Sequence, residues 1–432
     1  MKKTVVLYPG LAASHFIPMM QLADVLLEEG YDVVVALIDA VMEHNIAFAA
    51  AVDRVASSKL AAVTFHTLPR IHDPPTVTND VNLLLGYFEM IRRYNEHLRE
   101  FLCSIPPRSI HAVIVDSWSD AALDVTDELG IPAYSFFASN ASALAVCLQL
   151  PWARRAEGQP SFKELGDATV NFHGVPPMPA SHLIHEVLED PNTEIYKAVV
   201  NSLAKNLEAG GILVNTFASL EARAVAALKD PHFLTESGLT VPPVYCVGPL
   251  VEDAAETKEK HESLKWLNEQ PEHSVVFLCF GSLPEGFLER TRGRGLVVKL
   301  WAPQVEVLRH KATGAFITHC GWNSVLEAIM AGVPMLCWPL YAEQKMNKVL
   351  MVEEIGIGVD LAGWQHGLVK AEELEAKVRL VMESEEGERL RARVTVHKEA
   401  AAMVWKDGGS SHMAFGQFLS DVGRVEPDLI LG

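Results

Sequence analysis

The stretch Ala315–Cys337 reads AFITHCGWNSVLEAIMAGVPMLC and carries the clearest signal of the fold class. It contains an apolar run that ends at Thr318, a tight turn with Gly321, a helical segment, and a second apolar run that ends at Cys337. Short apolar runs separated by helices are typical of parallel strands that are covered on both faces of the sheet. The stretch therefore predicts one strand–helix–strand unit of a doubly wound α/β domain.

The same pattern extends in both directions from this unit. Upstream, strands are predicted at 4–8, 31–38, 62–65, 112–115, 133–137, 212–215 and 244–247. Around the unit itself, strands are predicted at 275–280, 296–300, 315–318, 334–337 and 358–361. Between the two series lies an acidic stretch without periodicity, Val251–His261, which suits a linker. The fold class is therefore α/β, with two doubly wound, Rossmann-like domains that face a cleft.

The predicted domain boundaries follow from these patterns. They are an N-terminal domain at 1–248, a linker at 249–263, a second domain at 264–412, and a C-terminal helix or tail at 413–432 that packs back on the first domain. A length of 432 residues fits this division.

Composition excludes several classes of function. The formal net charge of −19 repels nucleic acid and anionic membranes, so neither is expected as a partner. No uninterrupted apolar run reaches the roughly 18 residues that span a bilayer, and no secretory signal is visible. The six cysteines are scattered without a CxxC pair, which indicates free thiols in a reducing compartment. We therefore expect a cytoplasmic protein.

The turn after Thr318 has the features of an anion site. The start of a helix offers free N–H groups and the positive end of the helix dipole, and His319, Asn323 and Ser324 add donors there. Asn323 or Ser324 alone could equally be a helix N-cap. Glu327, one turn further along, could accept both hydroxyls of a ribose or be a solvated surface residue. The adjacent His319 and Gly321 favour anion binding.

Taken in order, the pieces from Trp301 to Gln344 resemble the plant secondary-product glycosyltransferase signature of the family 1 UDP-glycosyltransferases. The resemblance runs from the His15 loop to the GGSS stretch at 408–411, and FHGVP at 172–176 is most similar to enzymes acting on flavonoids and other phenols. It implies a GT-B fold. It also implies a UDP-sugar site at Ser282, Trp301, Ala302, Gln304, His319, Gly321, Trp322, Asn323, Ser324, Glu327, Glu343 and Gln344.

Individual roles follow from the same resemblance. Trp301 would stack on uracil, and the Ala302 backbone with Gln304 would bond the edge of the base. Glu327 would hold the ribose, and His319, Asn323 and Ser324, helped by Ser282, would bind the diphosphate. Trp322, Glu343 and Gln344 would hold sugar hydroxyls, and a closing Gln344 implies UDP-glucose as the donor.

Transfer to a hydroxyl also needs a base, since a neutral alcohol is a poor nucleophile. His15 follows the first strand and Asp116 ends another, so both side chains could meet at one rim of the sheet. The resemblance implies the same pair as catalytic base and supporting acid, in a loop where Ser14 replaces the usual glycine. Candidates for the acceptor pocket are Trp118, Phe136, Tyr87 and Met178, although each could equally be plain core.

We therefore expect an inverting hexosyltransferase of plant secondary metabolism. It would move glucose from UDP-glucose to a hydroxyl of a small lipophilic acceptor, a flavonoid or other phenol. The resemblance implies no cofactor and no metal, and we expect a monomer whose partners are the acceptor and the UDP-sugar. Two other functions are less well supported. The His15–Asp116 pair argues against a UDP-sugar isomerase, and a nicotinamide dehydrogenase would need a GxGxxG motif after a strand, which this sequence lacks.

The sequence departs from the family pattern after Phe280-Gly281-Ser282. The chain runs directly into Leu283-Pro284-Glu285-Gly286, where the family carries a further helix and strand. On the order of 30 residues, the size of one strand–helix–strand unit, are missing there. The second sheet is therefore expected to lack a strand and its covering helix, and to expose apolar surface. This loss motivates an alternative function, a non-catalytic UDP-sugar-binding protein.

Overall fold

The computed structural model describes residues 3–38, 45–59, 62–75, 83–106, 109–154, 158–235, 237–252, 261–279, 291, 293–298 and 302–424. The chain divides into two units. The first is Met1–Leu250 together with Asp407–Gly432, and the second is Val251–Lys406. Residues 407–412 group with the first unit, whereas the sequence placed the boundary after residue 412.

The first unit is built on a seven-stranded sheet in which every pair of neighbours is parallel. The strand order is β3-β2-β1-β4-β5-β8-β9, so the sheet is doubly wound from β1. Its strands are β1 Thr4–Tyr8, β2 Asp32–Leu37, β3 Val63–Thr67, β4 Ile110–Asp116, β5 Ala133–Phe137, β8 Ile212–Val214 and β9 Val244–Cys246. Each lies within a few residues of its predicted position, because long runs of Val, Ile and Leu suit a sheet that is buried on both faces.

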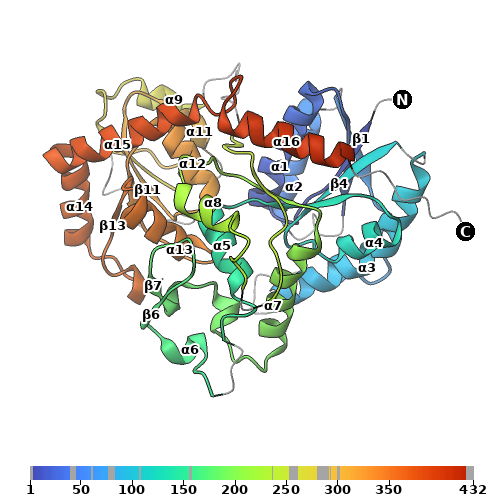
Figure 1. The fold of residues 1–432 in the computed structure, drawn as a ribbon. Coiled ribbons are helices and arrows are strands. Elements are labelled where there is room, and N and C mark those ends of the chain that lie inside the picture. Colours follow the sequence, from blue (N-terminus) through green and yellow to red (C-terminus); the bar gives the residue numbers. More distant parts are fainter. Residues whose placement is uncertain are drawn as a thin grey trace, which may run out of the picture. The chain divides into compact units, whose positions relative to one another are not determined.

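Helices connect these strands and cover the sheet (Figure 1). They are α1 Ala13–Glu28, α2 Ile46–Lys59, α3 Leu83–Ser104, α4 Ala122–Glu128, α5 Ala141–Gln149, α6 Phe162–Leu165, α7 Glu194–Lys205, α8 Ala222–Leu228 and α16 Ser410–Arg424. A short antiparallel pair, β6 Thr169–Val170 and β7 Met178–Pro179, was not predicted from the sequence. Two-residue strands are too short to produce a periodic signal.

The last helix, α16, packs on the sheet of the first unit. The ring of Phe418 lies edge-on to Tyr134 at a centroid distance of 4.9 Å and also contacts Tyr245 at 5.6 Å. Tyr245 donates its hydroxyl to Asp421 Oδ2 at 2.8 Å. The chain thus returns to the first unit after it has formed the second.

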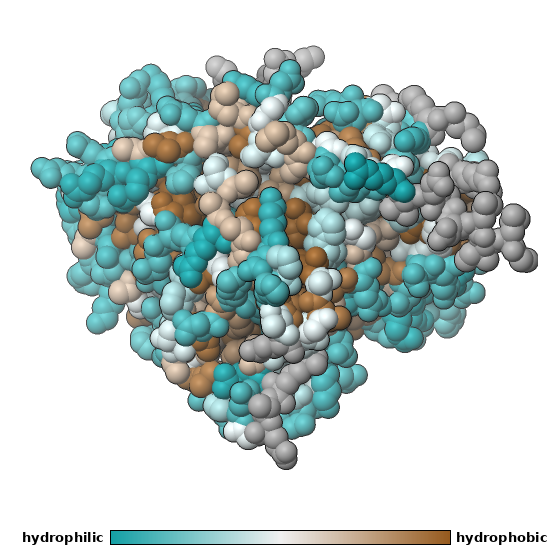
Figure 2. All heavy atoms as spheres, in the orientation of Figure 1, coloured by the Kyte–Doolittle hydropathy of each residue, from teal (hydrophilic) through white to brown (hydrophobic). Residues whose placement is uncertain are grey.

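The second unit carries a four-stranded parallel sheet in the order β10-β11-β12-β13. Its strands are β10 Val275–Leu278, β11 Thr313–Thr318, β12 Met335–Cys337 and β13 Gly358–Asp360. Its helices are α9 Glu262–Leu267, α11 Gln304–Arg309, α12 Trp322–Ala331, α13 Gln344–Val349, α14 Ala371–Glu383 and α15 Glu385–Ala401. Hydrophilic side chains cover α14 and α15 at the left of Figure 2. The core lies under them, where Ile317, Leu336 and Val381 pack together.

The strand predicted at 296–300 is wrong for the part that can be compared, because residues 296–298 form no strand. Gly293 has a left-handed φ of 75° and Gly295 follows it, so the chain turns where a strand would begin. Among the described strands β10 pairs only with β11, and it is the edge of the sheet. Leu278 on β10 is 43% exposed and Leu296 is 38% exposed. An exposed apolar side chain, Leu278, is therefore present at this edge, as expected. Residues 280–290, where the sequence departs from the family, lie outside the described part of the chain.

Within the described ranges, none of the helices combines the length and the apolar character needed to cross a membrane.

Candidate active site

His15 lies in the first turn of α1, directly after β1 and its loop. Its Nδ1 is 2.8 Å from Oδ2 of Asp116, a residue 101 positions further along the chain. The two side chains differ in exposure, since the imidazole is 27% exposed and the carboxylate is 0% exposed. The reachable member of the pair is therefore the imidazole, and the carboxylate supports it from beneath.

The pair forms because β1 and β4 are parallel neighbours in the sheet. Tyr8 at the end of β1 is in register with Val115, and Asp116 is the next residue and the last of β4. Carboxyl ends of parallel neighbours share one edge of a sheet. Asp116 Oδ1 also accepts the backbone N–H of Trp118 at 3.1 Å, so both carboxylate oxygens are engaged. A His15 tautomer that donates Nδ1–H to the carboxylate leaves Nε2 as the proton acceptor.

Gly10 is a further residue of this site that sequence reasoning did not select. A Cβ at this position would lie 2.8 Å from both Cγ and Oδ1 of Asp116 and 3.0 Å from Cβ of His15. Its importance is steric, because only a residue without a side chain lets the loop approach the buried carboxylate. A Pro-Gly pair in a sequence normally indicates only a turn, so the sequence alone carried no signal for this contact.

The four predicted acceptor residues differ in exposure. Phe136, Met178 and Tyr87 are buried, with 0%, 3% and 8% exposure. Trp118 is half-buried, and its indole lies against the half-buried Phe88 at a ring-centroid distance of 5.9 Å. Of the four, Trp118 alone presents substantial surface, and it lies two residues from Asp116.

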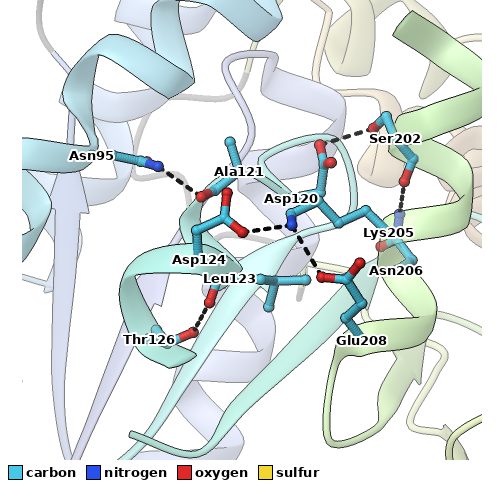
Figure 3. Close-up of polar contacts among 10 residues, drawn as sticks. All are labelled: Asn95, Asp120, Ala121, Leu123, Asp124, Thr126, Ser202, Lys205, Asn206 and Glu208. Atoms are coloured by element: carbon cyan, nitrogen blue, oxygen red, sulfur yellow. Dashed lines mark hydrogen bonds and ion pairs between the residues drawn. The ribbon is translucent and has the colours of Figure 1, made fainter. Parts of the chain in front are cut away.

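Neighbouring helices hold the segment that follows Asp116 in place (Figure 3). Ser202 of α7 donates its hydroxyl to Asp120 Oδ1 at 2.8 Å, and Asn95 of α3 donates to the Ala121 carbonyl at 2.7 Å. Burial raises the pKa of Asp120 to about 7, although the Ser202 hydrogen bond opposes the shift. Lys205 of α7 also forms an ion pair with Asp124 of α4, in which Nζ lies 2.6 Å from Oδ1. The segment is thus fastened on two sides.

In the second unit, the turn between β11 and α12 has a backbone shaped for close approach. Cys320 has a left-handed φ of 66°, which a residue with a side chain rarely adopts. Gly321 is the N-cap of α12, and a Cβ on it would overlap Nε2 of His319. The alternative that Asn323 or Ser324 is only the N-cap of this helix is excluded, because Gly321 holds that position. The left-handed Cys320 starts the helix at Trp322, which puts both residues inside the first turn, where backbone N–H groups have no helical partner.

This turn is anchored by Asn347 of α13, a residue that no motif in the sequence singled out. Its Nδ2 donates to the carbonyl of Cys320 at 2.9 Å and to Glu343 Oε1 at 3.3 Å, and it is 1% exposed. Burial lowers the pKa of His319, although the nearby Glu343 opposes the shift. His319 is therefore a neutral hydrogen-bonding group near pH 7.

Gln304, Ser324 and Glu327 form a second polar group in this unit. Gln304 Nε2 donates to Ser324 Oγ at 2.8 Å and to Glu327 Oε2 at 2.7 Å. Burial raises the pKa of Glu327 to about 7, and the Gln304 hydrogen bond only partly offsets the effect. A carboxylate that is desolvated and already bonded by one amide is poised to gain further donors.

The remaining predicted donor residues lie as follows. Gln344 is 3% exposed, and its Oε1 accepts the backbone N–H groups of Leu340 at 2.9 Å and Tyr341 at 3.0 Å. Trp322 is 3% exposed, whereas Ala302 is half-buried. Ser282 and Trp301 lie outside the described residues. Across the described ranges, no group of three or more His, Cys, Asp or Glu residues is arranged to hold a metal ion.

Comparison with known proteins places these features in context. Residues 230–400 match the family model described as UDP-glucoronosyl and UDP-glucosyl transferase. The chain is 36% identical to an anthocyanidin 5,3-O-glucosyltransferase of a Rosa hybrid cultivar, with 94% of this chain and 96% of that protein covered. That alignment runs over 463 residues, more than the 432 of this chain. The rose protein therefore contains residues that this chain lacks.

Solved structures agree over nearly the whole chain. One is a UDP-glucosyltransferase from Polygonum tinctorium, capable of glucosylating indoxyl, in complex with 3,4-dichloroaniline. It has a TM-score of 0.85 and 32% identity, and 98% of this chain and 99% of that chain are covered. Another is a Phytolacca americana protein complexed with UDP-2fluoro-glucose and pterostilbene. It has a TM-score of 0.85 and 28% identity, with 98% and 100% coverage.

Proposed function

This chain belongs to the UDP-glucoronosyl and UDP-glucosyl transferase family, and from that premise we propose that it transfers glucose from UDP-glucose to a hydroxyl of a small phenol such as a flavonoid. The observation that carries the proposal is the 2.8 Å contact between the reachable imidazole of His15 and the buried carboxylate of Asp116. An imidazole oriented in this way is the general base that a hydroxyl nucleophile needs.

The reaction is a single displacement at the anomeric carbon. His15 Nε2 takes the proton of the acceptor hydroxyl, and the acceptor oxygen forms the new bond as the bond from sugar to UDP breaks. Asp116 stabilises the imidazolium that results. UDP leaves with the bonding electron pair, and the configuration inverts from α to β. The contact of Asp116 with His15 Nδ1 is already in place before this step.

The donor residues take their roles from the second unit. His319 and the first-turn N–H groups at Asn323 and Ser324 bind the diphosphate, which the positive end of the α12 dipole also favours. Gly321 leaves the space for the His319 imidazole beside this turn. Glu327 accepts the ribose hydroxyls, a role that its half-buried, Gln304-bonded carboxylate supports.

The other donor roles concern the base and the sugar. Glu343 and Gln344 bind sugar hydroxyls, and Gln344 does so through its amide nitrogen because its oxygen holds Leu340 and Tyr341. The backbone of Ala302 bonds the uracil edge. Trp301 stacks on uracil, and Ser282 helps to bind the diphosphate. Trp322, whose side chain is buried, binds the sugar hydroxyls through its backbone.

The acceptor identity follows from the relatives and from Trp118. The rose relative is named for anthocyanidin and the Phytolacca protein is complexed with pterostilbene, and both compounds are phenols. The half-buried indole of Trp118, two residues from Asp116, supplies an aromatic surface for such a ring. Since the relatives are named as glucosyltransferases, they do not favour the alternative of a non-catalytic UDP-sugar-binding protein.

The experiment that tests the function uses the full chain with UDP-glucose and a panel of phenols. UDP release and the mass of the glycoside are measured, and UDP-galactose serves as the competing donor. His15→Ala is expected to abolish transfer and to leave UDP affinity within twofold. Glu327→Ala is expected to weaken UDP affinity. Transfer at the normal rate by His15→Ala would refute the assignment of the base.

Three further properties belong to the same proposal. We propose that transfer proceeds without a metal ion, so activity should persist in excess EDTA. We propose that the enzyme acts as a monomer, so light scattering should give the mass of one chain. We also propose a cytoplasmic location, which the six free thiols support.

A further inference from the structure

Asn206 carries a buried amide at the point where α7 ends. It is the C-cap residue of that helix and is 5% exposed. Its Nδ2 donates to the carbonyl of Ser117 at 3.0 Å and to the carbonyl of Ser202 at 2.9 Å, the second of which is drawn in Figure 3. Its Oδ1 accepts the hydroxyl of Ser135, a residue of β5. Both N–H donors and the carbonyl oxygen therefore have partners, and these fix the orientation of the amide.

The Ser117 carbonyl belongs to the peptide unit that bonds the supporting acid. A trans peptide unit is planar, so the carbonyl of Ser117 and the N–H of Trp118 point to opposite sides of one rigid group. The Trp118 N–H donates to Oδ1 of Asp116 at 3.1 Å. Oδ2 of the same carboxylate lies 2.8 Å from Nδ1 of His15. The orientation of this peptide unit therefore decides whether a backbone N–H points at the carboxylate that supports the base.

The two neighbouring peptide units are held by backbone hydrogen bonds. The N–H of Ser117 donates to the carbonyl of Phe136 at 3.0 Å, and the N–H of Ser119 donates to the carbonyl of Asp116 at 2.8 Å. The unit between them is held by side chains, with Asn206 at its carbonyl and Asp116 at its N–H. A substitution at Asn206 can therefore release this unit and leave the backbone bonds on either side of it intact.

The series of hydrogen bonds is shielded from water. Asp116 and Ser135 are 0% exposed, and Ser117 is 5% exposed. In such surroundings a hydrogen bond is electrostatically stronger than in water, and successive bonds polarise one another. A donor on the Ser117 carbonyl makes the Trp118 N–H a better donor in turn. Asn206 therefore both orients and strengthens the bond from this N–H to the carboxylate.

We propose that Asn206 is a positioning residue, whose amide orients the peptide unit between Ser117 and Trp118 so that this unit holds the Asp116 carboxylate against His15. The inference rests on the proposed function, because it concerns the geometry of the general base. Asn206 acts through Asp116, so its loss affects turnover and not the binding of the donor.

The test compares two asparagines that each donate to the segment after Asp116. Asn206→Leu removes the donor from the Ser117 carbonyl and keeps a side chain of similar volume. Asn95→Leu is the matched control, since Asn95 donates to the Ala121 carbonyl at 2.7 Å, further along the segment. Asn206→Leu is expected to lower kcat about tenfold, while the KM for UDP-glucose stays within about twofold. Asn95→Leu is expected to keep kcat within about twofold of the wild-type value.

A double-mutant cycle separates positioning from general damage to the unit. In an enzyme that carries Asp116→Ala, the carboxylate through which Asn206 acts is gone. Adding Asn206→Leu to that enzyme should therefore change its residual kcat by less than about twofold. A side chain that only stabilises the unit would lower kcat by the same factor in both backgrounds, and that result would overturn the proposal.

Asn206→Ala keeps the test decisive if Asn206→Leu folds poorly. The smaller side chain leaves room for water beside the polar atoms that lose their partner, and kcat should again fall about tenfold. Wild-type kcat in either Asn206 variant would contradict the proposal, as would an Asn95→Leu enzyme that loses kcat equally. Failure of the wild-type enzyme to glucosylate any phenol would instead refute the proposed function.

Discussion

Replacing Gly10 with alanine tests the active-site geometry most directly. The added Cβ would lie 2.8 Å from both Cγ and Oδ1 of Asp116, whereas ordinary contact begins at 3.4 Å. The backbone at Gly10 is not left-handed, so the substitution introduces crowding without backbone strain. The variant therefore pushes on the carboxylate that supports His15 and on Cβ of His15 itself, which would lie 3.0 Å from the added Cβ.

The size of the effect follows from how firmly Asp116 is held. Its carboxylate is 0% exposed, with one oxygen 2.8 Å from His15 and the other bonded to the N–H of Trp118. Either the carboxylate or the Gly10 loop must move by about 0.6 Å, the difference between the two contact distances, in a close-packed interior. Since a 1 Å misplacement can slow catalysis about 100-fold, kcat should fall roughly 10- to 100-fold.

Steady-state kinetics with saturating UDP-glucose and a phenol measures this loss, and calorimetric titration with UDP measures the donor affinity separately. Affinity for UDP should stay within twofold, because Glu327 and the α12 turn belong to the second unit. Gly416→Ala in α16 is the matched control, since no atom lies within 4 Å of its added Cβ. A Gly10→Ala enzyme with wild-type kcat, or one whose kcat falls only as far as UDP affinity does, would refute the reasoning.

Three other predictions concern the second unit. Burial raises the pKa of Glu327 to about 7, and the carboxylate is the form that accepts ribose hydroxyls. UDP affinity should therefore be about tenfold weaker at pH 6 than at its high-pH plateau. Glu327→Gln should remove this pH dependence, and a wild-type UDP affinity that does not change with pH would contradict the prediction. Gly321→Ala should weaken UDP binding at least tenfold because its Cβ overlaps His319, and unchanged affinity by calorimetry would exclude the crowding. Leu278→Thr should reduce aggregation on heating, since Leu278 is 43% exposed on an edge strand; equal light scattering from both proteins would disprove it.

Local patterns in the sequence predicted most of the fold. The strands of the first sheet and the strand–turn–helix at Thr318 were visible because a buried strand is a short, continuous apolar segment with breakers on either side. The strand predicted at 296–300 failed for a matching reason. An apolar run becomes a strand only when it hydrogen-bonds to a neighbour, and among the described strands β10 pairs with β11 alone.

The residues of the site differ in the same way in how far the sequence could predict them. The donor residues after Thr318 are close in the sequence, so their grouping is a local property of one turn. The sequence could nominate His15 and Asp116 as members of one rim. The 2.8 Å contact between them depends on the adjacency of β1 and β4, and no local pattern encodes which strands become neighbours.

Local sequence patterns specified the class of fold, the chemical types at the donor turn, and the imidazole after β1. The contacts between distant residues became visible only in the folded chain: Gly10 against Asp116, Asn347 under the Cys320 turn, and Gln304 on Glu327. The physical reason is that periodicity records which side of a segment is buried, whereas a contact between distant residues depends on how whole segments pack together.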